Sequence, residues 1–172
     1  MDELTELALS ARHGDTAAAT AFVRATQADV WRLCRHLGSP GTAEDLVQES
    51  YARAFASLHR FAGRSSARTW LLSIARRTCA DAVRAAVKQR CALDSPPQQP
   101  DHAESVALHS LLAALDDDRR EAFVLTQLVG LSYPEAADVC GCPVGTIRSR
   151  VARARADLVA AHGGRRSERR IG

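Results

Sequence analysis

A proline-rich stretch near the middle of the chain limits what this protein can fold into. The stretch ALDSPPQQPDHAES, residues 92–105, contains three prolines and two glutamines and has no periodic apolar pattern. Because proline interrupts both helices and strands, we expect an extended linker here. The linker separates a domain over residues 1–91 from a domain over residues 106–162, and residues 163–172 are expected to be a disordered basic tail. Each domain must bury a small core of its own.

Hydrophobic periodicity indicates that both domains are all-α. Aromatic residues make up only 5% of the chain, so the cores must be built from Leu, Val, Ile and Ala, which suit closely packed helices. No alternating strand pattern of useful length occurs. The expected helices cover residues 2–12, 17–37, 43–58 and 67–89 in the first domain, and 104–115, 117–130, 133–140 and 144–162 in the second. Thr42 and Ser132 are the expected N-caps of the helices that follow them.

Several classes of protein are disfavoured by the sequence. No window approaches 18 uncharged apolar residues, and the acidic N-terminus does not resemble a secretory signal, so we expect a cytoplasmic protein without membrane contact. The five cysteines form an odd set, which favours reduced thiols over a disulfide framework. Cys140 and Cys142 lack further ligands at zinc spacing, so no metal and no other cofactor is expected. No nucleophile–base pair or phosphate-binding glycine loop is visible, so an enzyme is the least favoured class.

The net charge of +3 conceals two basic blocks. Residues 64–93 carry six arginines and one lysine against one aspartate, and residues 139–172 carry eight arginines against two acids. Between them, residues 94–138 carry nine acids against two arginines. Basic blocks of this kind indicate phosphate contact at two places, although two solvated helix faces would also account for them.

The strongest motif is LSYPEAADVCGCPVGTIRSRVARARADL, residues 131–158, which has the short helix, glycine turn and second helix of a helix-turn-helix. At 100° per residue, Ile147, Val151 and Leu158 share one apolar face of the second helix. The opposite face presents arginines, whose guanidinium groups bind guanine edges or phosphates, and the first amides of the helix can bind a phosphate. The expected DNA contacts are Val144, Gly145, Thr146, Arg148, Ser149, Arg150, Ala152, Arg153 and Arg155.

This motif resembles the promoter −35 module of the extracytoplasmic-function (ECF, group 4) bacterial sigma factors, which direct RNA polymerase to promoters. The run PVGTIRSR followed by ARAR carries the resemblance in the second domain. AEDLVQESYARAF at residues 43–55 and RTWLLSIARRTCADAVR at residues 68–84 carry it in the first. The resemblance covers about residues 5–160 and implies a sigma region 2 domain, the linker, and a sigma region 4 domain.

The resemblance also implies the partners: core RNA polymerase, through the clamp helices of its largest subunit and the flap of its β subunit, promoter DNA, and in many family members an anti-sigma factor. It assigns clamp binding to the helix that contains DLVQES. On that helix Asp45, Gln48 and Glu49 share one exposed face, which suits a basic partner. Without the resemblance, an ordinary solvated face would be the simpler interpretation.

The loop at residues 64–69 and the helix after it resemble the part of the family that opens and reads the −10 element. This task requires a basic groove, a flat side chain for stacking and a pocket for a flipped base. Trp70 is either a wedge between bases or a core residue. The expected −10 contacts are Arg64, Ser65, Ser66, Arg68, Trp70, Arg76, Arg77 and Arg84.

Two other functions compete with a sigma factor at this point. A stand-alone helix-turn-helix regulator would bind duplex DNA tightly without polymerase and would have no use for the Asp45, Gln48 and Glu49 face. A protein-interaction module without DNA function would not need the basic face from Arg148 to Arg153. The alternating charge blocks also suggest regulation, either by packing of the two domains on each other or by an anti-sigma factor, and nothing in the sequence chooses between them.

Overall fold

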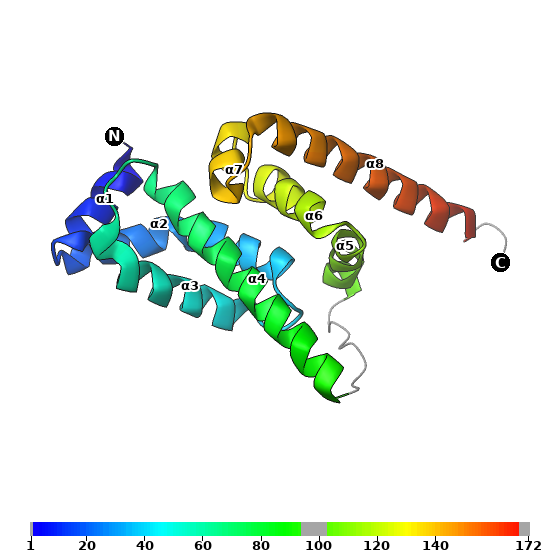
Figure 1. Ribbon diagram of the computed structural model, residues 1–172, viewed down its shortest axis with the longest axis horizontal. Helices are drawn as coiled ribbons and strands as arrows, with labels where there is room; N and C mark the ends of the chain where they lie inside the picture. The colour runs from blue at the N-terminus through cyan, green and yellow to red at the C-terminus, as the bar shows by residue number, and fades with distance from the viewer. Residues whose placement is uncertain (1, 94–102, 169–172) are drawn as a thin grey trace. The chain divides into compact units, whose positions relative to one another are not determined.

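The computed structural model describes residues 2–93 and 103–168, and the chain divides into two compact units, Met1–Gln98 and Gln99–Gly172. Every regular element among the described residues is helical (Figure 1). The all-α prediction is therefore confirmed. The division between the units falls within the proline-rich segment, whose centre, residues 94–102, lies outside the described residues, as do residues 169–172 of the expected tail.

The first unit contains α1 (Glu3–Arg12), α2 (Thr16–Leu37), α3 (Ala43–Ser57), a 3₁₀ turn (Leu58–Arg60) and α4 (Ala67–Leu93). Asp2 and Asp15 cap α1 and α2, because each carboxylate accepts a hydrogen bond from a backbone amide of the first turn. Thr42 precedes α3, but its hydroxyl donates to Ser39 O at 2.7 Å instead of capping the helix. Its backbone, with φ −101° and ψ 2°, is not in the extended conformation that a capping bond needs.

The core of the first unit lies between α2, α3 and α4, with α1 packed against α2 and α4. Phe22 and Leu33 of α2 and Leu71 and Leu72 of α4 are at most 2% exposed. Each such side chain contributes about 1.5–3 kcal/mol through burial, which makes this core the main stabilising feature of the unit.

The second unit contains α5 (Ala103–Ala113), α6 (Asp117–Phe123), a π-helical turn (Val124–Leu128), α7 (Tyr133–Cys140) and α8 (Val144–Glu168). The sequence predicts one helix over residues 117–130, but the α-helix ends at Phe123. Val129 N then donates to Val124 O at 2.9 Å, across five residues. In this wider turn the angle between successive side chains is smaller than in an α-helix. Val124, Leu125 and Thr126 can therefore all face the core, and all three are buried.

The helix ends beside the linker and at the C-terminus differ from the predicted boundaries. α4 continues to Leu93 and α5 begins at Ala103, so helix enters the expected linker from both sides. α8 continues past His162 to Glu168, into the segment predicted to be a disordered tail. Extending an established helix is easier than starting one, so the two glycines at 163 and 164 do not end it. None of the described helices combines the length and apolar character that crossing a membrane requires.

Candidate protein and nucleic-acid interfaces

The second helix of the helix-turn-helix, α8, sorts its side chains into two opposite faces. Ile147, Val151 and Ala154 are at most 1% exposed and pack inside the second unit. Arg148, Ser149, Ala152 and Arg153 are exposed. The predicted separation of an apolar face from an arginine face is therefore confirmed.

The turn between α7 and α8 depends on Gly141. Its φ of 66° and ψ of 39° lie in the left-handed region, where a side chain is strained. The amides of Gly141 and Cys142 both donate to Ala137 O and so end α7. At the other end of α7, Ser132 and Glu135 form the predicted cap: Glu135 Oε2 accepts from Ser132 N at 2.8 Å, and the Ser132 hydroxyl accepts from Glu135 N. The two caps fix both ends of α7, and the turn at Gly141 sets the direction in which α8 begins.

Two of the predicted phosphate-binding arginines have partners within the second unit. Arg150 donates to Asp118 of α6 and also contacts Cys142 Sγ at 3.8 Å, and Arg155 donates to Gln127 Oε1 at 2.7 Å. Both guanidinium groups therefore hold α8 against earlier parts of the unit, Arg150 against α6 and Arg155 against the π-helical turn. A phosphate would have to share or replace these bonds.

Local hydrogen bonds narrow the rest of the predicted contact set. Ser149 donates its hydroxyl proton to Thr146 O at 2.9 Å, so its oxygen faces outward as an acceptor. Thr146 N donates to Pro143 O at 2.9 Å, which leaves Val144 and Gly145 as the amides best placed for a phosphate. Arg148 and Arg153 extend from the exposed face with no competing bond in the described part of the unit.

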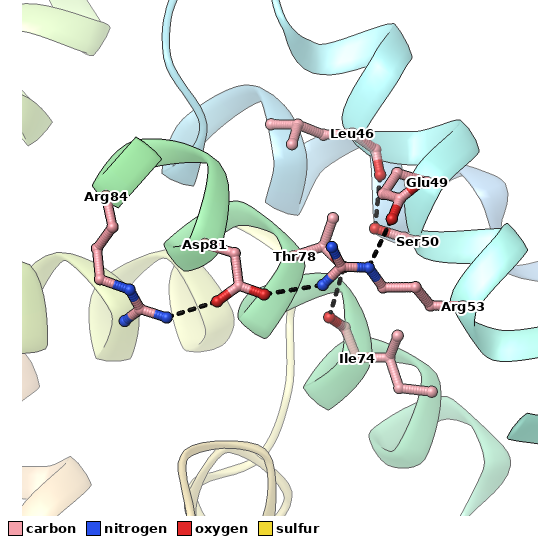
Figure 2. Close-up of polar contacts among 8 residues, drawn as sticks. All are labelled: Leu46, Glu49, Ser50, Arg53, Ile74, Thr78, Asp81 and Arg84. Carbon is pink, nitrogen blue, oxygen red and sulfur yellow. Dashed lines mark hydrogen bonds and ion pairs between the residues drawn. The ribbon is translucent and has the colours of Figure 1, made fainter. Parts of the chain in front are cut away.

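On α3 the structure places Asp45, Gln48 and Glu49 on the exposed side and buries Leu46 and Ser50 on the other. The predicted orientation of this helix is therefore confirmed. The Ser50 side chain is fully buried, and its hydroxyl donates to Leu46 O at 2.6 Å (Figure 2).

An ion-pair network runs from this face to α4 (Figure 2). Arg53 Nε lies 2.7 Å from Glu49 Oε1, and Arg53 Nη1 lies 2.8 Å from Asp81 Oδ2. Asp81 also pairs with Arg84, at 2.5 Å. The hydrogen bonds from Arg53 and Arg84 lower the pKa of Asp81, and those to Asp81 and Glu49 raise the pKa of Arg53. Because the network is exposed, salt screens it, and it responds readily to a charged partner.

The loop before α4 presents only part of the predicted −10 set. Arg64 and Ser65 are exposed, but Ser66 Oγ accepts from Thr69 N at 3.1 Å and so caps α4. Arg68 binds Asp29 of α2 through two nitrogens, at 2.8 and 2.7 Å. Both side chains are largely covered, so this pair holds α4 against α2.

Farther along α4, Trp70 is half-buried and packs on the buried Phe61, with ring centroids 4.8 Å apart. Arg77 and Arg84 are exposed and Arg76 is half-buried. The basic surface that remains for a DNA strand therefore centres on Arg64, Arg77 and Arg84, the last of which is paired with Asp81.

Two models of protein families match this chain: "Sigma-70 region 2" over residues 22–89 and "Sigma-70, region 4" over residues 105–158. The "Probable RNA polymerase sigma-C factor" of Mycobacterium bovis is 48% identical over 168 residues, which cover 92% of this chain and 91% of the relative. The chain belongs to the ECF RNA polymerase sigma factors. The ECF RNA polymerase sigma-E factor of Escherichia coli K12 is 32% identical over 176 residues, covering 90% of this chain and 92% of the relative.

Solved structures of ECF sigma factors share the fold. CnrH, solved in complex with the cytosolic domain of CnrY, matches with a TM-score of 0.80 and 30% identity over 95% of this chain and 99% of its own. RpoE of Bartonella quintana, solved with the anti-sigma factor NepR, matches with a TM-score of 0.73 and 30% identity over 81% and 92% of the two chains. This ECF sigma factor therefore acts in transcription initiation, with RNA polymerase and promoter DNA.

Sequence reasoning missed the partners that organise these surfaces, namely Asp29, Arg53, Asp81 and Asp118. One of them carried a visible sign, because Asp81 is the only acid among residues 64–93. Asp29 and Asp118 pair with residues distant in the sequence, as Arg53 does with Asp81, and no local pattern reveals such a pairing.

Proposed function

We propose that this ECF sigma factor divides promoter recognition between its two units and binds polymerase through α3. The sorting of α8 into a buried apolar face and an exposed arginine face supports the proposal most directly. The protein supplies binding and positioning, and the chemistry of RNA synthesis belongs to the polymerase. We place this activity in the cytoplasm, where polymerase and chromosome meet.

The α8 face fits the major groove of the −35 duplex. Arg148 and Arg153 carry guanidinium forks that pair bidentately with guanine, and Ser149 offers an acceptor oxygen between them. A good bidentate pair discriminates against the wrong base by about 1–3 kcal/mol. Ala152, on the same face, has room only for a small apolar contact.

The loop before α4 and the basic side of α4 fit the −10 strand. Arg64 and Ser65 stand at the tip of the loop, and Arg77 and Arg84 follow on α4. A single strand needs cationic side chains along its phosphates and a small polar site for an unstacked base. Only residues 94–102 separate α4 from α5, which is too short a stretch for a further domain, so we expect melting to depend strongly on the −10 sequence.

The α3 face fits the basic clamp helices of the largest polymerase subunit. Asp45, Gln48 and Glu49 offer two carboxylates and an amide on one side of a helix. Opposite charge across such an interface speeds encounter and fixes register more than it raises affinity. We assign a second contact, with the flap of the β subunit, to the second unit.

The experiment separates the three contacts with purified core polymerase. Binding to core is measured by fluorescence anisotropy, and binding of the holoenzyme to a −35 duplex is measured separately. Asp45→Asn combined with Gln48→Ala should weaken core binding, while Glu44→Gln, which removes an exposed charge from the same helix, should weaken it less. Arg148→Ala and Arg153→Ala should each reduce −35 binding by about tenfold or more and leave core binding unchanged.

Two arginine controls test whether a loss of −35 binding comes from lost base contacts or from lost charge. Arg24→Ala removes an exposed charge from the first unit and should leave −35 binding unchanged. Arg150→Ala removes a charge from α8 itself, but its guanidinium is bonded to Asp118, so the loss should be smaller than for Arg148. Equal losses for all four arginines would show a general charge effect and overturn the assignment of base contacts to α8.

We also propose that an anti-sigma factor holds this protein inactive, since the solved relatives CnrH and RpoE were captured with such partners or with a cytosolic domain. Affinity purification of the tagged chain from its own host under non-inducing conditions tests this. Recovery of core polymerase as the only stoichiometric partner would contradict it.

A further inference from the structure

The loop that precedes α4 lies beside α1 (Figure 1), and side chains of α1 bond to both of its ends. At the start of the loop, Arg12 Nη1 donates to Phe61 O at 2.9 Å. At its end, the Thr5 hydroxyl oxygen accepts from Ala67 N at 3.0 Å. Between these bonds Leu9 lies under the loop, where its Cδ1 would be 3.5 Å from a Cβ added to Gly63. α1 therefore supports the loop at both of its ends and beneath Gly63.

The Thr5 hydroxyl is the middle of a hydrogen-bond chain. It donates its proton to Asp2 Oδ2 at 2.6 Å, so its lone pair is available to the Ala67 amide. The hydrogen-bond chain therefore runs from the Asp2 carboxylate, through the Thr5 hydroxyl, to the Ala67 amide at the start of α4. A charged end strengthens such a chain, and negative charge at a helix N-terminus is favourable.

This hydrogen-bond chain is buried where it meets the loop. Thr5 is 1% exposed and Ala67 is fully buried, so without the Thr5 oxygen the Ala67 amide would lose its partner in a place that water does not reach. A buried amide without a partner is unfavourable enough to shift the backbone that carries it. Arg64 and Ser65, the exposed tip of the loop, lie between the two bonds to α1 and would move with it.

We propose that α1 is part of the promoter-reading machinery and that Thr5 is a positioning residue for −10 recognition. The inference rests on the proposed function of the loop and goes beyond it, since the family match to region 2 begins at residue 22, after α1. Thr5 does not touch DNA. It fixes the conformation of the loop tip before the DNA strand binds. Binding then does not carry the entropic cost of ordering the loop.

The experiment uses the full chain assembled with core polymerase. The probe is a pool of fork-junction DNAs that share one duplex and differ in a randomised single-stranded −10 segment. Sequencing the bound fraction gives the enrichment of each −10 sequence for each variant. Binding to core polymerase and to −35 duplex is measured in parallel as a check on each holoenzyme.

Three substitutions separate positioning from stability. Thr5→Val keeps the shape and removes the hydroxyl, whereas Thr5→Ser keeps the hydroxyl. Leu37→Val weakens the core at the end of α2, away from the loop, and controls for lost stability through its melting temperature. We expect Thr5→Ser and Leu37→Val to enrich the same −10 sequences as the unaltered chain, and Thr5→Val to enrich them about five- to tenfold less.

Ser65→Trp blocks the tip of the loop directly, and so separates the proposed function of the loop from the positioning role of Thr5. If Ser65→Trp abolishes the enrichment and Thr5→Val leaves it unchanged, the loop reads the strand and the positioning role of Thr5 is wrong. If neither changes the enrichment, the proposed function of the loop fails and the inference fails with it. If Leu37→Val loses as much enrichment as Thr5→Val, the effect is one of stability and the inference is overturned.

Discussion

Arg53 of α3 donates a hydrogen bond to Asp81 of α4, with 2.8 Å between Nη1 and Oδ2. The bond joins the helix that we propose to bind polymerase to the helix that we propose to hold the −10 strand. Glu49 and Arg84 extend the network at either end, so that each of these two surfaces contributes one member (Figure 2).

Asp81→Asn should tighten binding of the holoenzyme to single-stranded −10 DNA. The substitution releases Arg84 from its carboxylate and removes the only acid of the basic block. At low ionic strength we expect affinity to rise about two- to fourfold, and the gain to shrink as salt screens it. Glu44→Gln, which removes an exposed acid from α3, should have no such effect. Unchanged or weaker binding by Asp81→Asn would contradict the restraint of Arg84 by Asp81.

Stability should depend on pH through Asp2. Its hydrogen bond from Thr5 lowers the pKa of the carboxyl below the ordinary value of 3.8. A lowered pKa means that the carboxylate stabilises the fold above that ordinary value, and that this contribution disappears as the pH falls through the folded-state pKa. The free energy of unfolding, measured with denaturant from about pH 6 to about pH 3, should therefore fall more steeply for the unaltered chain than for Asp2→Asn. Parallel curves would contradict the Asp2–Thr5 bond.

Gly141→Ala should destabilise the second unit. Alanine at a φ of 66° is strained, and we expect the free energy of unfolding to fall by about 1–2 kcal/mol. Gly145→Ala is the matched control, because a Cβ there meets nothing within 4 Å and alanine favours a helix. Thermal unfolding monitored by circular dichroism should show a lower melting temperature for the first variant and an equal or higher one for the second. The reverse order would refute the role of Gly141 in the turn.

The cysteines should react with an alkylating reagent in order of exposure. Cys34 and Cys79 are at most 1% exposed, whereas Cys91 is exposed. A hydrogen bond with Cys79 lowers the pKa of the Cys34 thiol despite burial, but reaction still requires the core to open. Mass spectrometry of the native protein should find Cys91 modified at least about a hundredfold faster than Cys34. Comparable rates for the two would show that the core of the first unit opens readily.

The sequence predicts local features of this protein well. The 3.6-residue periodicity places Ile147 and Val151 in the core and Arg148 on the surface, and the serine–glutamate spacing predicts the cap at Ser132. These features depend on residues within one or two helical turns of each other. The family could be indicated for the same reason, because the motifs that resemble it are short and continuous in the sequence.

Features that depend on distant residues were not predicted. Periodicity shows which side of a helix is exposed, but it does not show what crosses from a neighbouring helix to meet it. Arg68 and Arg150 read as DNA contacts in the sequence, yet they meet Asp29 and Asp118, 39 and 32 residues away. The π-helical turn at Val124 escaped prediction as well, since it arises from packing three consecutive side chains into one core.

In vitro transcription with purified core polymerase on genomic DNA, followed by sequencing of transcript 5′ ends, tests the central claim most directly. Adding this protein should create start sites that are absent with core polymerase alone, and those sites should share one element near −35 and another near −10. Arg148→Ala should reduce use of these sites most where the −35 element is weakest. A set of start sites identical with and without the protein would contradict the account.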